Sequence, residues 1–391
     1  MDNNLDFQKT LLNFLRGEKE LINDLDMFYF KNQNDTIGYI VEQKLENIFC
    51  KKVEEYGLDT NNIIFYKKVE EFKNKVYLEN LKKFRISIKL IKFFEEKGIN
   101  LTPYKGFVYS FLAFGSPYDR NLADLDFLLE NPKDIFKIYD LIKDDKTFVM
   151  EYGKKITKES LYWEIKNNQE LTIIFEDVIF EIHNTIKDKF YFFPRANYAW
   201  WNDSKMETIS IEGENIIMPK KELFLLEIFC HNVYHEWSPL GMPFDMSYLL
   251  KNNDFDWNFI YDKAKKLGIT NILNEGLLYT YKITGYEPYP NFAKKTQNKI
   301  VEETVKKMEE NNIYQRVIVE KKSPLKKTAR RLLQAVEEKE TLSDKILTIV
   351  NYFFVPTKRN YEMLKLPKYL YFLYYIFNPV FMILSRIRST L

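Results

Sequence analysis

The sequence predicts an α+β fold, in which a mixed β-sheet with helices is flanked by helical regions on both sides. Apolar residues recur at helical spacing through the first 97 residues, and the same spacing returns from Pro219 onward. Between these regions lie short runs with the period of two that is typical of strands, most clearly over residues 171–183. A central group of strands between two helical regions indicates the α+β class.

The first 97 residues are expected to form a helical region that leads into the sheet. Leu11 and Leu15 belong to one apolar series, and residues 81–94 carry a second one. Gly98 closes the last of these helices, because glycine readily adopts the left-handed conformation that ends a helix. Residues 99–104 then begin the first strand.

Two acids mark the next expected strand. In the run Ala-Asp-Leu-Asp-Phe-Leu-Leu, Asp124 and Asp126 project from one face, while Leu125 and Phe127 project from the other. Adjacent like charges on an apolar sheet repel, and a divalent cation such as Mg²⁺, which prefers carboxylate and phosphate oxygens, removes that cost. The alternative is a strand edge whose acids face water.

A third acid follows on a later strand. Residues 171–183 are expected to form two strands that turn at Glu176-Asp177, and Glu181 lies between apolar neighbours on the second. His183 would face the same side as Glu181, where it would orient the carboxylate, touch phosphate or make a structural hydrogen bond. Residues 156–163 are expected to complete the mixed sheet.

These motifs resemble the nucleotidyltransferase superfamily that includes DNA polymerase beta. The order Lys-Gly, a mostly apolar run, Arg120 and then D-h-D-h-L is similar more narrowly to a bacterial uncharacterised nucleotidyltransferase family, over roughly residues 88–269. The resemblance implies a nucleotidyltransferase-fold sheet, an NTP such as ATP as substrate, and Mg²⁺ (or Mn²⁺). It implies Asp124, Asp126 and Glu181 as catalytic and metal-binding residues, and Lys105, Gly106, Ser116, Arg120, His183, His231 and Asp245 as nucleotide-binding residues.

Two glycines are candidates for the phosphate-binding element of that superfamily. Gly115-Ser116 matches the residue types of the superfamily's motif, whereas Lys105-Gly106 matches the position of that motif along the chain. The gap from Gly115 to Asp124 is short for an intervening helix, so Lys105-Gly106 is favoured as the end of the first strand. The backbone amides there and the following helix N-terminus would face phosphate.

The other residues with the capacity for chemistry have simpler explanations. His231 and His235 share a helix face and could bind zinc with Cys230 or His183, but a structural hydrogen bond is the favoured interpretation for His231. Two cysteines provide no disulfide framework, and the N-terminal residues do not resemble a secretory signal, so a cytoplasmic protein is expected. A net charge of +2 gives no strong nucleic-acid signal.

The region after the sheet is expected to contain a helical domain and an apolar tail. Residues 369–384 are apolar, but they are too few to span a bilayer and include Asn378-Pro379. Docking on the rest of the protein is favoured, with peripheral membrane contact as the alternative. The expected regions are helical N-terminal residues 1–97, a catalytic core at 98–205, a helical domain at 206–355 and the apolar segment 356–391.

Three classes of function fit these features. The favoured one is an Mg-dependent enzyme that transfers a nucleoside monophosphate (NMP) from an NTP to an unidentified acceptor, namely a small molecule, a carbohydrate or a peptide. A toxin-like transferase that modifies protein or RNA is the second class, and a non-catalytic nucleotide-binding module is the third. Residues 190–201 would be a lid or interdomain packing. The basic residues 321–331 would be a solvated helix start, or a segment that meets an anionic acceptor or a membrane surface.

Overall fold

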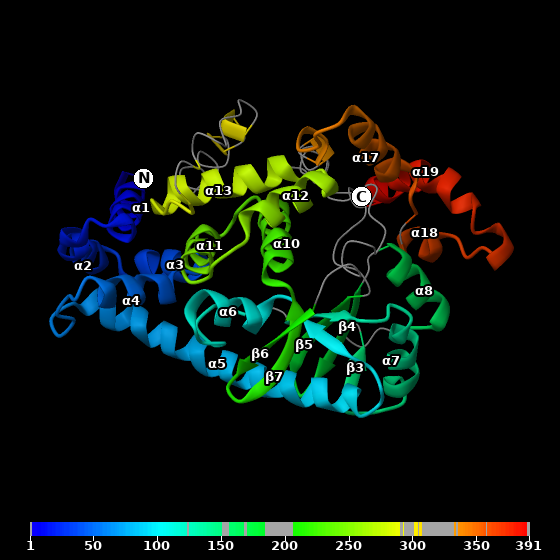
Figure 1. Ribbon diagram of the computed structural model, residues 1–391, viewed down its shortest axis with the longest axis horizontal. Coiled ribbons are helices and arrows are strands. Elements are labelled where there is room, and N and C mark those ends of the chain that lie inside the picture. Colours follow the sequence, from blue (N-terminus) through cyan, green and yellow to red (C-terminus); the bar gives the residue numbers. More distant parts are fainter. Residues whose placement is uncertain are drawn as a thin grey trace.

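The chain is described by a computed structural model in which a five-stranded sheet lies among helices (Figure 1). The described residues are 2–122, 125–150, 156–167, 170–183, 206–289, 292, 301–303, 305–306, 332–333, 335–356 and 358–388. Asp124 and the segments 190–201 and 321–331 lie outside the described residues. A mixed sheet together with many helices confirms the predicted α+β class.

The helical N-terminal region is confirmed. Figure 1 shows its last and longest helix running from the bundle of preceding helices to a position alongside the sheet. Gly98, with a φ of 71°, follows this helix, and the Ile99 N–H donates to the Phe94 carbonyl at 2.9 Å, as in a left-handed helix end. The elements are α1 Asp2–Arg16, η1 Lys19–Leu21, α2 Ile22–Lys31, α3 Gln33–Glu42, α4 Glu46–Glu55 and α5 Ile64–Glu95.

The five-stranded sheet has the order β1-β2-β5-β4-β3. The β2–β5 pair is parallel, whereas β1–β2, β5–β4 and β4–β3 are antiparallel, so the sheet is mixed. Its elements are β1 Leu101–Pro103, α6 Gly106–Phe114, β2 Leu125–Leu129, α7 Asp134–Ile142, β3 Phe148–Met150, α8 Lys158–Asn167, β4 Glu170–Phe175 and β5 Val178–His183.

The expected strand at residues 156–163 is wrong, because helix α8 begins there. The physical reason is a reciprocal N-terminal cap. The Ser160 N–H donates to Thr157 Oγ1 at 3.2 Å, and the Thr157 N–H donates to Ser160 Oγ at 2.9 Å. Such a pair satisfies amides that the first turn of a helix leaves free. The strand that completes the sheet beside β4 is instead β3.

A hairpin that the sequence patterns did not anticipate precedes the second helical region. Its strands are β6 Met206–Ile211 and β7 Glu214–Pro219, which pair with each other in a separate two-stranded sheet. Glu212 and Gly213 both have positive φ values, 52° and 80°, as a two-residue hairpin turn requires. The helices then follow: α10 Lys221–Tyr234, α11 Gly241–Lys251, α12 Trp257–Leu267 and α13 Thr270–Thr284.

The C-terminal elements lie at one side of the molecule, next to α8 (Figure 1). They pack on one another, and Tyr374 is their fully buried aromatic residue. No helix among the described residues is long and apolar enough to cross a membrane. The elements are α17 Leu342–Phe354, α18 Lys358–Met363, η4 Lys368–Leu370 and α19 Leu373–Arg388.

Candidate active site

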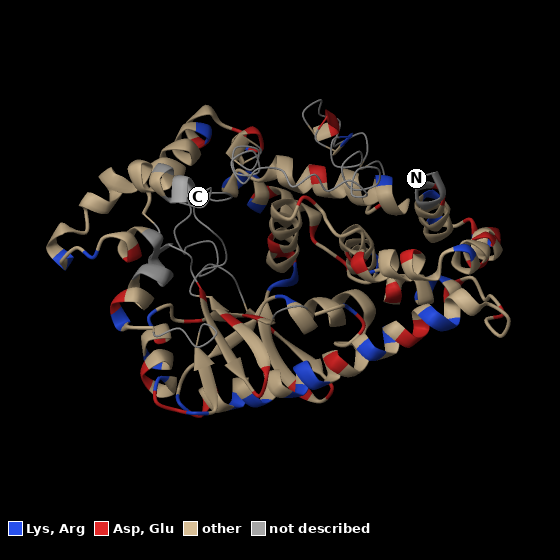
Figure 2. Ribbon diagram, turned by 180° about the vertical axis from the view of Figure 1, so that it is seen from behind, with Lys and Arg blue, Asp and Glu red and all other residues tan. Residues whose placement is uncertain are grey.

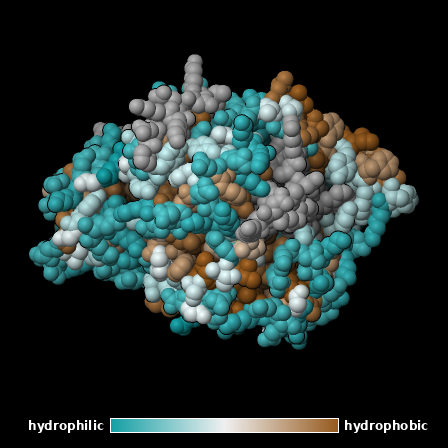
Figure 3. Space-filling view, viewed as in Figure 1, coloured by the Kyte–Doolittle hydropathy of each residue, from teal (hydrophilic) through white to brown (hydrophobic). Residues whose placement is uncertain are grey.

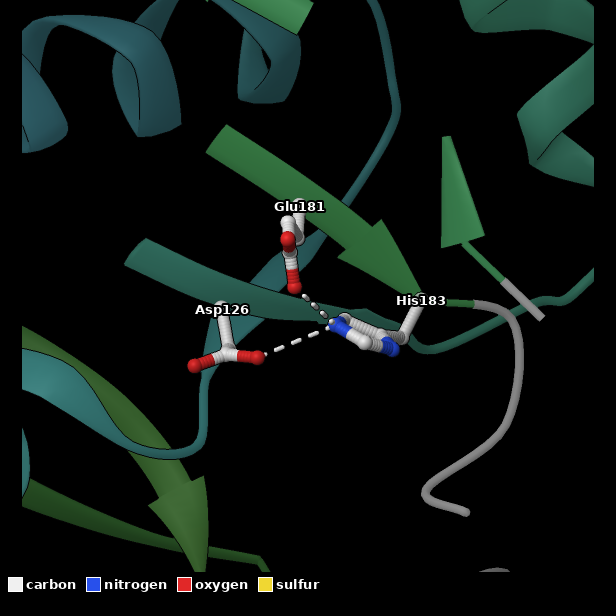
Figure 4. A group of neighbouring side chains, drawn as sticks. All are labelled: Asp126, Glu181 and His183. Carbon is white, nitrogen blue, oxygen red and sulfur yellow. Dashed lines mark hydrogen bonds and ion pairs between the residues drawn. The ribbon is translucent and has the colours of Figure 1, made fainter. Parts of the chain in front are cut away.

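Strands β2 and β5 bring two acids and a histidine together. Their parallel register places Asp126 opposite Glu181 and Leu128 opposite His183. Because side chains alternate along a strand, these three polar side chains share one face of the sheet, where they point toward one another (Figure 4). One ligand atom from each lies within 4.8 Å of the other two. Within the described part of the chain, this is the one group of three such residues able to hold a metal ion.

Asp126 is a buried carboxylate with two positively charged neighbours. Lys105 Nζ donates to Asp126 Oδ1 at 2.9 Å, and His183 Nε2 donates to the same oxygen at 3.1 Å. Burial opposes ionisation of this carboxyl, but the Lys105 ammonium and His183 outweigh burial and hold the pKa of Asp126 well below its usual range. Asp126 is therefore ionised at neutral pH.

His183 is positioned by acids on both sides. Its Nε2 lies 3.7 Å from a Glu181 oxygen, and its Nδ1 lies 3.9 Å from a Glu170 oxygen. Burial disfavours the imidazolium, but the contacts with Asp126 and Glu181 outweigh burial and raise the pKa of His183 to about 9. Burial also raises the pKa of Glu170 to about 7. The cluster thus places the negatively charged Asp126 carboxylate within hydrogen-bond distance of the Lys105 ammonium and the His183 ring.

The junction between β1 and α6 places Lys105 beside this cluster. The Tyr104 N–H donates to the Asp126 carbonyl at 3.3 Å, so the chain leaves β1 next to the start of β2. Gly106 then begins α6 with a φ of 54°, a left-handed conformation that favours glycine. Of the two candidate glycines, Gly106 lies at this junction and Gly115 ends the helix at its other end.

Arg120 and Asp245 pair with each other rather than with the cluster. Arg120 Nε donates to Asp245 Oδ2 at 2.8 Å, and the guanidinium lies 4.5 Å from the centre of the Tyr109 ring. Both residues line a polar pocket whose lining includes none of Asp126, Glu181 and His183. Burial raises the pKa of Asp245 to about 6, and Arg120 opposes this shift.

Ser116 supports the loop between α6 and β2. Its hydroxyl accepts a hydrogen bond from the Tyr118 N–H at 3.3 Å, and its carbonyl accepts one from the Ser110 hydroxyl at 2.7 Å. The Ser110 hydroxyl in turn accepts the Arg120 N–H at 2.9 Å. The contacts of Ser116 therefore stabilise a turn.

His231 lies on α10, with its ring 4.5 Å from that of His235, as expected for residues four apart on a helix. Cys230 is fully buried. Among the described residues, these side chains do not form a group of three metal ligands, which leaves the zinc alternative without structural support.

Two residues near the site were not identified from the sequence. Glu170 lies opposite His183 in the β4–β5 hairpin, a position that the two-residue turn at Glu176-Asp177 already fixes. Asn80 on α5 is 1% exposed and donates to the carbonyls of Tyr118 at 2.8 Å and Arg120 at 2.7 Å. No local pattern marks Asn80, because its partners lie about 40 residues away.

Comparison with known proteins gives the class and then the family. The model of the family described as uncharacterised nucleotidyltransferase matches residues 31–285. The chain is therefore a transferase of the nucleotidyltransferase class. Because the match covers more than half of its length, the chain belongs to this uncharacterised nucleotidyltransferase family. No curated protein and no solved structure matches the chain.

Proposed function

We propose that the chain transfers an NMP from an NTP to a hydroxyl or similar group of a small molecule, carbohydrate or peptide, with a divalent cation as cofactor. The observation that supports this best is the parallel register of β2 and β5, which places Asp126 opposite Glu181 with His183 at hydrogen-bond distance from Asp126. Membership of a nucleotidyltransferase family supplies the reaction class.

The donor set of the cluster suits a divalent cation. Carboxylate oxygens are the ligands that Mg²⁺ and Mn²⁺ prefer, and those of Asp126 and Glu181 converge within 4.8 Å. The proposed ligands are Asp124, Asp126 and Glu181. When bound, the metal would supply a Lewis acid for the phosphates and for the acceptor oxygen. His183 would orient Asp126 and Glu181 rather than ligate.

The chain's own residues would bind the phosphates and move one proton. Lys105 is a buried ammonium beside Asp126, and the amides at the start of α6 follow it, so this corner is proposed to hold the leaving phosphates. The acceptor oxygen attacks the α-phosphorus, and the bond between that phosphorus and the bridging oxygen breaks. Pyrophosphate departs with the bonding electrons. Glu181 is proposed to accept the acceptor's proton.

The remaining predicted residues have more distant proposed roles. Arg120 and Asp245 form one ion pair, so they are proposed to shape the wall of the nucleotide site as a unit. Ser116 is proposed to act through the loop that it stabilises. His231, on α10, stays a proposed nucleotide contact.

Label transfer from each of the four α-labelled NTPs, with Mg²⁺ or Mn²⁺ and a cell extract as acceptor source, tests the proposal. We expect transfer by the full chain to fall by more than about 100-fold in Asp126→Asn and in Glu181→Gln. Mn²⁺ binding measured by calorimetry should weaken in the same variants. Glu176→Gln is the matched control for Glu181→Gln, because Glu176 is a partly exposed acid at the turn of the same hairpin.

The outcomes separate the classes of function. A labelled small molecule or peptide supports the proposal, whereas label on large protein or RNA favours the toxin-like alternative. Metal-dependent NTP binding without transfer to any acceptor would favour the non-catalytic module. Full activity in Asp126→Asn would contradict the assignment of the active site to this cluster.

A further inference from the structure

Helix α17 has its apolar face on the outside. Its two buried residues are polar, Asp344 and Thr348, which are 8% and 1% exposed. The exposed large side chains are apolar and recur at positions i, i+4, i+7, i+8, i+11 and i+12 of one helix face. An ordinary surface helix has the opposite arrangement, with apolar residues toward the core. The exposed series is Leu342, Ile346, Ile349, Val350, Phe353 and Phe354.

Helix α19 and the residues before it repeat this inversion. An exposed apolar stripe with a spacing of four runs through Phe372, Ile376, Val380 and Leu384, and Ile376 is 59% exposed. The buried side chains are Tyr374 and Asn378, which is only 3% exposed. The apolar stripe therefore points away from the protein.

Asn378 fixes the two inverted helices relative to each other. Its amide nitrogen donates to the carbonyls of Phe353 at 3.0 Å and Val355 at 2.9 Å, at the end of α17. Its amide oxygen accepts from Asn360 of α18 at 2.8 Å. Because buried amides that are fully bonded hold one geometry, the two apolar faces are presented together.

The two faces form one surface, here called the C-terminal apolar surface and represented by Ile346, Val350, Phe353, Phe372, Ile376 and Val380. Thirteen of the twenty-five exposed large hydrophobic side chains of the described residues belong to residues 342–384. Figure 3 shows the hydrophobic colour gathered over this part of the molecule, at the upper right. A concentration of this kind marks an interaction surface rather than scattered exposure.

The charge around the surface identifies its partner. After Glu362 the sequence contains no acidic residue, but it contains Lys365, Lys368, Arg386 and Arg388. Figure 2 shows few charged residues along α17 and α19 themselves. Exposed aromatic residues such as Tyr369, which is 78% exposed, accompany the apolar stripe. Apolar and aromatic residues flanked by cations suit the boundary between anionic headgroups and acyl chains.

We propose that the C-terminal apolar surface binds the face of an anionic lipid bilayer, with α17 and α19 lying in the interface. The absence of a helix able to span a membrane within the described residues is consistent with a helix that lies on the bilayer. The proposal does not depend on the transferase activity.

Flotation of the full chain with vesicles tests the proposal. The two vesicle types are phosphatidylcholine alone and an equimolar mixture with phosphatidylglycerol. We expect binding to the anionic vesicles that weakens as salt is raised, and little binding to the neutral ones. Ile376→Glu should reduce binding by at least about tenfold, because it places a charge in the centre of the apolar stripe. Lys365→Glu combined with Lys368→Glu should reduce binding to the anionic vesicles only.

Leu78→Glu is the matched control, because Leu78 is a similarly exposed apolar residue, at 64%, on helix α5. It should bind vesicles as the unaltered chain does, and the melting temperature should be unchanged in both glutamate variants. Failure of the unaltered chain to bind anionic vesicles would overturn the proposal. Equal loss of binding in Leu78→Glu would also overturn it. A dimer that Ile376→Glu converts to a monomer, without vesicle binding, would assign the surface to self-association instead.

Discussion

Asp126 and Glu46 are both buried carboxyl groups, but their surroundings give them opposite properties. Asp126 has an ammonium and an imidazole within 3.1 Å, so its ionised form is stabilised. Glu46, at the start of α4, is 4% exposed, and its Oε1 has no hydrogen-bond partner. Burial raises the pKa of Glu46 to about 7. A buried acid whose charged partners outweigh burial is suited to chemistry, whereas one for which burial outweighs a nearby charge, here Lys44, costs stability when it ionises.

Glu46 is expected to make stability depend on pH. Between its ordinary pKa of 4.5 and about 7, the folded chain binds more protons at Glu46 than the unfolded chain does. The free energy of unfolding therefore falls as pH rises through this window. Glu46→Gln removes the ionisable group, so we expect it to stabilise the protein by about 1–3 kcal/mol at pH 8 and by little at pH 4.5. Urea unfolding at the two pH values measures the difference.

The control for Glu46→Gln is Glu176→Gln, which changes an exposed acid in a turn. It should leave the pH dependence unaltered. An equal gain for Glu46→Gln at both pH values would show that the effect arises from packing instead of from protonation.

At the scale of elements, the site depends on how α6 begins. Gly106 has a φ of 54°, so an added Cβ would strain the backbone next to Lys105. Gly106→Ala should destabilise the protein by about 1–2 kcal/mol and also lower transfer activity, because the Lys105 ammonium would move relative to Asp126. Gly98→Ala is the control, since Gly98 also has a positive φ, 71°, with no atom within 4 Å of the added carbon. Thermal melting and label transfer should show similar destabilisation by both, but loss of activity only in Gly106→Ala.

The loop between α6 and β2 is held by Asn80, which makes that residue a positioning residue. Asn80→Ala would remove donors from two carbonyls of the loop and should destabilise the protein by about 2–3 kcal/mol. Asn253→Ala is matched, because Asn253 also donates to two carbonyls, Leu112 and Leu249, but at the other end of α6. Both variants should have a lower melting temperature, whereas transfer activity at a temperature where both are folded should fall only in Asn80→Ala. Equal activity in the two would make Asn80 purely structural.

Local features of the sequence predicted some of these elements and missed others for identifiable reasons. The β4–β5 hairpin was predictable because period-two runs flank a two-residue turn, and that turn alone fixes which residues face each other. Helix α8 was missed because apolar residues near 156–163 outweighed the cap formed by Thr157 and Ser160. The β6–β7 hairpin was missed although Glu212-Gly213 is a turn signal between alternating residues.

The site required pairing that a single sequence does not encode locally. Asp126 and Glu181 were each recognisable as acids between apolar neighbours, but they meet only because β5 pairs with β2 across more than fifty residues of chain. The partners of Arg120 and Asn80 were hidden for the same reason, since α11 and the α6–β2 loop converge through tertiary packing. Local patterns thus predicted the residue types, whereas the meeting of Asp126 and Glu181 in one site was predicted only by the resemblance to the nucleotidyltransferase superfamily.

At the scale of the whole molecule, the N-terminal helices and the helices after the hairpin share one core. The buried hydrophobic cluster runs from Phe7 to Val305 without separating the regions at 1–97 and 206–285. Hydrogen bonds to backbone carbonyls join them too. The Gly241 N–H donates to the Gln43 carbonyl at 2.8 Å, and Arg16 Nε donates to the Ile283 carbonyl at 2.8 Å. These two regions are therefore expected to unfold together.

Gly241 lies at that junction without room for a side chain, which allows the expectation to be tested. A Cβ on Gly241 would lie 2.6 Å from the Lys44 carbonyl oxygen, a backbone atom that cannot rotate away. Gly241→Ala should therefore lower the free energy of unfolding by about 1–3 kcal/mol. Gly38→Ala, within α3 and with no atom within 4 Å of the added carbon, should instead raise it by about 0.5–1 kcal/mol. In urea titrations of Gly241→Ala, the unfolding midpoints measured by tryptophan fluorescence and by helical circular dichroism should shift together. If the two helical regions folded independently, the strain at Gly241 would instead open the junction before either region unfolds. Fluorescence and circular dichroism would then report separate unfolding transitions.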